Sequence, residues 1–89
     1  MELTFNKVGN KYEAEFELSA DANLHVEFKN AASIKLYQRT TGSGWDLVNG
    51  VKNAAGKAID VDLQALIYPK YIRVSCATQP TMAVVTFAE

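Results

Sequence analysis

The sequence is poor in the residues that carry out most catalysis and that form covalent cross-links. Its 89 residues include one cysteine, Cys76, and one histidine, His25. A single cysteine excludes an internal disulfide, so packing has to stabilise the fold. A single histidine leaves few arrangements for general acid–base catalysis, because histidine is the commonest general base. We therefore expect a protein that is not an enzyme and that uses no cofactor and no metal.

The sequence also lacks an excess of one charge and a long hydrophobic run. Nine basic and ten acidic residues give a formal net charge of -1, whereas nucleic-acid-binding proteins usually carry a basic patch. No segment approaches the ~20 apolar residues that span a bilayer, and residues 1–6 lack the features of a signal peptide. We expect no nucleic-acid partner, no membrane partner and synthesis in the cytoplasm.

Alternation of apolar and polar residues is the strongest positive signal in the chain. In the stretch 12–18 every second residue is apolar, and the residues between them are glutamates. A β-strand places successive side chains on opposite faces, so one face would enter a core while the other meets water. The predicted core face holds Tyr12, Ala14, Phe16 and Leu18, and the acidic face holds Glu13, Glu15 and Glu17.

The same period recurs along most of the chain and predicts about eight short strands in one domain, residues 1–89. Turn signals such as Gly9-Asn10 and Asn49-Gly50 separate the strands, residues 30–33 are expected to form a connection, and 64–68 a single helical turn. Parallel βαβ units need crossovers for which this chain has no room. We predict an all-β fold, an antiparallel β-sandwich with jelly-roll connectivity as one option.

The residues that could carry chemistry are better explained as structural or solvent-exposed residues than as catalytic or metal-binding ones. His25 alternates with aliphatic residues, which places it on the outward face of its strand, and Cys76 shares a face with the aliphatic residues of 71–77. A buried structural thiol is therefore expected. Asp60 and Asp62 share one strand face and could hold a hard cation, although a solvated face is the simpler explanation.

Aromatic residues beside arginines provide the better functional lead. Tyr37 and Arg39 alternate with aliphatic residues that already occupy the inside, and so do Tyr71 and Arg73. Each pair would place an aromatic ring beside a guanidinium on one outward face. Tyrosine and arginine are enriched at protein interfaces, so these four residues are candidate interface residues.

The last predicted strand, residues 82–87, is apolar on both faces, unlike the charged early strands. Either it lies centrally, or its second face meets another subunit. That second face adds Ala83, Val85 and Phe87 to the candidate interface and predicts a homo-oligomer.

Four segments carry a resemblance to a known group of proteins: Ile34-Lys35-Leu36-Tyr37, Gly44-Trp45-Asp46-Leu47-Val48, Tyr71-Ile72-Arg73-Val74 and Met82-Ala83-Val84-Val85. In their layout, the C-terminal two-thirds of the chain resembles the short β-sandwich accessory proteins of tailed-phage virions, which include capsid-decoration, head-fibre and neck or tail components. The resemblance implies a non-enzymatic, symmetric and oligomeric structural protein that is incorporated in a virion beside other structural proteins.

A second hypothesis from another class is a small carbohydrate-binding module. Exposed aromatic rings stack on sugars, and Trp45 follows a glycine-rich loop. In this hypothesis Trp45 and Tyr68 form the stacking platform, and Asp46 and Asn49 donate or accept hydrogen bonds.

Overall fold

The computed structural model describes residues 1–39, 44–47, 55–64 and 70–88. Within these ranges the chain forms seven β-strands and no helix, and every pairing is antiparallel. The predicted all-β antiparallel fold is confirmed. The strands are β1 (Asn6–Val8), β2 (Lys11–Leu18), β3 (Ala22–Arg39), β4 (Asp46–Leu47), β5 (Ala55–Leu63), β6 (Lys70–Cys76) and β7 (Met82–Phe87).

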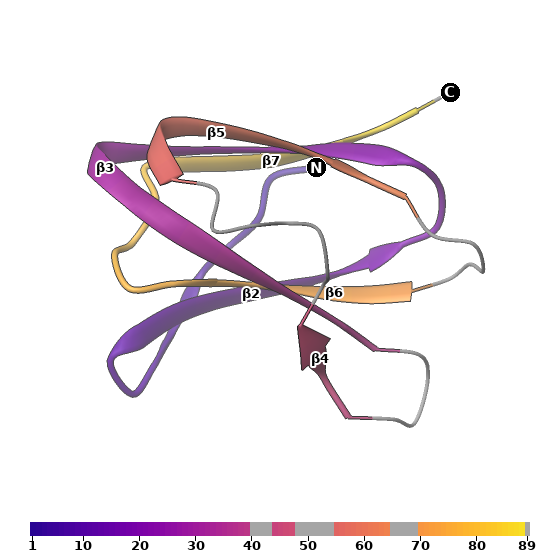
Figure 1. Cartoon of the computed structure of the whole chain (residues 1–89), viewed down its shortest axis with the longest axis horizontal. Helices are drawn as coiled ribbons and strands as arrows, with labels where there is room; N and C mark the ends of the chain where they lie inside the picture. The colour runs from indigo at the N-terminus through magenta and orange to yellow at the C-terminus, as the bar shows by residue number, and fades with distance from the viewer. Residues whose placement is uncertain (40–43, 48–54, 65–69, 89) are drawn as a thin grey trace.

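The strands lie in two layers that share β3 (Figure 1). In the layer at the bottom of Figure 1, here called the lower sheet, the strand order is β1-β2-β6-β3-β4. In the other layer, the upper sheet, the first half of β3 pairs with β5 on one side and β7 on the other. The second half of β3 pairs with β6 and β4, so this one strand belongs to both layers.

The length of β3 differs from the sequence prediction, which expected a connection at 30–33. The strand runs unbroken for 18 residues, and its pairing with β5 shifts register between Glu27 and Ala32. Such a shift bends a strand and increases its twist. Small residues at the bend let β3 pass from one sheet to the other. Even-numbered residues are buried on both sides of the bend, from Leu24 to Phe28 and again at Ile34 and Leu36, whereas Asn30 within the bend is exposed.

The hydrophobic core lies between the two layers and confirms most of the predicted inward faces. Ala14, Phe16 and Leu18 of β2 are buried, whereas Tyr12 at the start of that strand is half-buried. Cys76 is buried, as expected. The remaining buried apolar residues are Ala22, Leu24, Val26, Phe28, Ile34, Leu36, Ile59, Leu63, Ile72, Val74, Ala83 and Val85.

Of the two alternatives for the last strand, the one in which Ala83, Val85 and Phe87 form an exposed face is wrong. Ala83 is 5% exposed and Val85 is 0% exposed, and Phe87 packs half-buried against the core. Register explains this, because Val85 lies opposite Leu24 and therefore points to the same side as that core residue. The N-terminal segment covers the other edge of β7, where the Leu3 amide donates to the Ala83 carbonyl at 2.9 Å. Ala83 and Val85 therefore fill the core and cannot form a subunit interface.

One predicted turn is observed, and two predicted elements cannot be assessed. Gly9-Asn10 joins β1 to β2, and Gly9 has the positive φ of 63° that favours glycine. The Asn49-Gly50 hairpin and, apart from Gln64, the helical turn at 64–68 lie outside the described residues.

In the part of the chain that is described, no helix is long and apolar enough to cross a membrane.

Candidate interaction face

The outward side of the lower sheet is here called the outer face, and strand register arranges it in three rows. Each row takes one residue from β2, one from β6 and one from β3, because residues paired in register point to the same side of a sheet. The rows are Glu17–Tyr71–Arg39, Glu15–Arg73–Tyr37 and Glu13–Ser75–Lys35. The acidic residues thus lie along β2, and β3 contributes two cations and a tyrosine.

An aromatic–arginine cluster occupies the end of the outer face that adjoins β4. The guanidinium carbon of Arg39 lies 4.6 Å from the centroid of the Trp45 ring and 5.6 Å from that of Tyr71. The guanidinium carbon of Arg73 lies 4.4 Å from the Trp45 centroid. These distances are typical of cation–π contacts. Trp45 therefore links β3 and β6 across the sheet surface.

The two arginines differ in how their charge is balanced. Arg73 donates from Nε and Nη2 to Oε2 of Glu15, at 3.0 and 2.9 Å. Arg39 has no carboxylate partner among the described residues, and its Nε is buried without a hydrogen-bond acceptor there. A buried donor without an acceptor is costly, so Arg39 is the residue of this face that most needs an additional partner.

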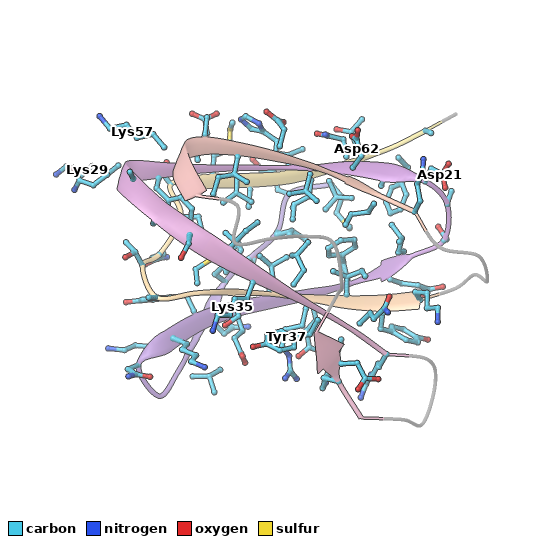
Figure 2. All side chains as sticks on the ribbon, viewed as in Figure 1. Asp21, Lys29, Lys35, Tyr37, Lys57 and Asp62 are labelled. Atoms are coloured by element: carbon cyan, nitrogen blue, oxygen red, sulfur yellow. The ribbon has the colours of Figure 1, made fainter. Side chains whose placement is uncertain are left out.

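The structure brings together four of the residues predicted for an interface. Tyr37 lies opposite Arg73, and Arg39 lies opposite Tyr71, so aromatic and cationic residues alternate on two neighbouring strands. Figure 2 shows Tyr37 at the lower layer, beyond the core. Because β6 lies between β2 and β3, the acidic residue Glu15 pairs with Arg73 of β6.

Two of the four residues of the carbohydrate hypothesis lie within the described residues. Trp45 is half-buried and Asp46 is exposed, opposite Gln38 in register. Asn49 and Tyr68 lie outside the described residues. Because two guanidinium groups contact the Trp45 ring, at least one face of that ring is already occupied. Sequence reasoning missed this packing, since it depends on β3 and β6 lying side by side, which alternation alone does not predict.

The outward side of the upper sheet carries the single histidine, as predicted. His25 lies between two carboxylates: Nδ1 is 2.8 Å from Oδ1 of Asp60, and Nε2 is 2.8 Å from Oε2 of Glu27. The next carboxylate along β5, Asp62, accepts a hydrogen bond from Asn23 at 3.2 Å. Within the described ranges, no group of three or more histidine, cysteine or acidic residues is arranged to hold a metal ion.

Hydrogen bonds to both carboxylates favour the doubly protonated imidazolium of His25. The bond to Glu27 is the largest cause and that to Asp60 the next, and they raise the pKa of His25 above its ordinary value of 6.5. A group whose pKa is higher in the folded state stabilises the fold fully below its unfolded pKa. That stabilisation is lost as the pH rises through the folded pKa.

We therefore predict that His25→Gln lowers stability more at about pH 6 than at about pH 9. Urea unfolding of both proteins across this range measures the difference. An NMR titration of the imidazole protons gives the pKa directly, and the signal is unambiguous because the chain has one histidine. A titration midpoint at or below 6.5 would contradict the prediction.

Cys76 lies in the core and is not close to His25. Burial raises the pKa of its thiol to about 12, so the thiol stays protonated near neutral pH and is a poor nucleophile. His25 lies on the outward side of the upper sheet, whereas Cys76 pairs within the lower sheet. The structure does not assemble a cysteine–histidine pair.

Comparison with protein-family models, curated proteins and solved structures found no match to this chain.

Proposed function

We propose that this chain is a non-enzymatic interaction module that self-assembles through the outer face of its lower sheet. The observation that carries the proposal is the cluster formed by Tyr37, Arg39, Trp45, Tyr71 and Arg73. Tryptophan, tyrosine and arginine are the residues most enriched at the energetic centres of protein interfaces. Here they come from β3, from β6 and from the residue just before β4. Contacts among Arg39, Trp45, Tyr71 and Arg73 hold these rings and guanidinium groups in place, and Tyr37 lies opposite Arg73.

The resemblance to phage virion accessory proteins supports the same role for the chain. Two of its four segments, those around Tyr37 and Tyr71, supply strands of the outer face. We propose on this basis a structural protein that assembles with copies of itself and attaches to a larger particle such as a virion. The two layers joined by β3 are consistent with a β-sandwich, which is the architecture that we propose for the module.

The proposal predicts an oligomer whose formation depends on Tyr37. Light scattering coupled to size-exclusion chromatography, over a concentration series, should show a mass above that of the 9.8 kDa chain. Tyr37→Ala should weaken association by about tenfold or more, because truncation of an interface centre costs over 1 kcal/mol.

Thr86→Ala is the matched control for this variant, since Thr86 is exposed on the upper sheet. It should associate as the unmodified chain does. A strict monomer at all concentrations would refute self-assembly and favour the carbohydrate hypothesis, in which Trp45→Ala removes sugar binding without unfolding the chain.

A further inference from the structure

The charges of the outer face that lack partners are arranged so that they complement a second copy of the same face. Among the described residues, Glu13, Glu17 and Lys35 form no ion pair within the chain. Within the described ranges Arg39 forms no ion pair either, and its guanidinium lies over the Trp45 and Tyr71 rings. The two acids lie on β2 and the two cations on β3, with β6 between them.

We propose that two copies pack outer face to outer face around a twofold axis nearly parallel to β6. This inference rests on the proposed function and specifies its partner and geometry. Rotation about such an axis turns the face over, so that β2 of one copy lies across from β3 of the other. Each row keeps its position along the strands. Glu17 then meets Arg39 of the second copy, and Glu13 meets Lys35 of the second copy.

The charge pattern selects this axis over the alternative. A twofold axis that also lay in the plane of the interface, but perpendicular to the strands, would place β2 of one copy against β2 of the other. Acidic residues would then face acidic residues, which is repulsive. On the chosen axis, Arg73 of one copy lies opposite Arg73 of the second copy. Glu15 of the same copy already balances the charge of each Arg73 at 2.9 Å. Face-to-face sheets pack with their strands about 30° apart, so the axis is nearly parallel to β6.

The arrangement also provides what Arg39 lacks. The carboxylate of Glu17 from the second copy would give the Arg39 guanidinium an anionic partner. Contacts with Trp45 and Tyr71 already fix the position of this guanidinium. Charge-assisted hydrogen bonds between guanidinium and carboxylate are among the stronger polar contacts. Because the axis is twofold, each pair occurs twice in the dimer.

The size of the face predicts a reversible dimer. About four strand spacings of ~4.8 Å and about seven residues of ~3.3 Å give roughly 450 Å² on each copy. The total of roughly 900 Å² lies in the range of transient complexes. The dimer should therefore dissociate on dilution in the micromolar range.

Charge reversal of one pair tests the geometry. Glu13→Lys and Lys35→Glu should each weaken the homodimer by about tenfold or more, because each places like charges together at two positions. An equimolar mixture of the two variants should form a heterodimer with about the affinity of the unmodified dimer, since both positions regain opposite charges. Sedimentation equilibrium, with one variant labelled with ¹⁵N and recovered from the dimer fraction, measures this.

Lys57→Glu is the control, because it makes the same change of charge at an exposed residue of the upper sheet (Figure 2). It should leave the dimer unchanged. If the unmodified chain self-associates but the mixture does not recover, the twofold geometry is overturned while self-assembly stands. If the unmodified chain is a monomer at every concentration, the proposed function fails and this inference fails with it.

Discussion

Leu24→Ala is expected to lower the free energy of unfolding by about 2–5 kcal/mol. Leu24 is 0% exposed and lies at the middle of the upper sheet. It is paired with Val61 of β5 on one side and with Val85 of β7 on the other. Removing its side chain leaves a cavity between two paired strands that cannot both move inward. A domain of this size has roughly 4–13 kcal/mol of stability in total, so the loss is a large fraction of it.

Urea unfolding, followed by circular dichroism and by the fluorescence of the single tryptophan, measures this loss. Asn23→Ala is the neighbouring control. Asn23 is half-buried on the opposite side of the same strand, where its side chain donates one hydrogen bond to Asp62. Its replacement should cost about 1 kcal/mol or less. A loss below about 1 kcal/mol for Leu24→Ala would mean that this part of β3 is not packed as the structure has it.

Alternation predicted the inward faces of β2, β3 and β6 correctly, because burial on one side of a sheet requires a period of two. The same reasoning placed Tyr37, Arg39, Tyr71 and Arg73 outside. It could not predict that β3 and β6 are neighbours, since pairing depends on register between segments 32 to 42 residues apart. The aromatic–arginine cluster became visible only once that register was known.

The bend of β3 was missed, although the sequence contained a signal for it. Asparagine and alanine at 30–32 disfavour strands, and that local preference suggested a connection. Yet the buried residues Phe28 and Ile34 are both even-numbered, so the same inward period holds on both sides of the bend, although Asn30 within it is exposed. Continuity of this period across a weak segment indicates one bent strand. If residues 30–33 were a loop between two separate strands, nothing would require the two strands to keep the same inward period.

The β7 error has a different cause, because both faces of that strand are apolar and alternation cannot choose between them. Ala83 and Val85 face the core, while Met82, Val84 and Thr86 face outward. Pairing with β3 decides the orientation, since Ala83 lies opposite Val26. Here tertiary register supplied information that local sequence did not contain.

Val85→Lys is therefore expected to abolish folding, an effect larger than that of a lost subunit contact. Val85 is 0% exposed, and a lysine there would bury a charge among aliphatic residues with no acid beside it. Such substitutions exceed about 4 kcal/mol, which is comparable to the total stability of the domain. Circular dichroism and proton NMR should show an unfolded chain.

Thr86→Lys provides the matched control, because the next residue of β7 is exposed on the outward side. It should remain folded, with a melting temperature within a few degrees of the unmodified chain. The pair of variants separates the two assignments of the strand. If the outward face were instead the one with Val85, Val85→Lys would stay folded and Thr86→Lys would unfold. The burial of Val85 opposite Leu24 requires the first result.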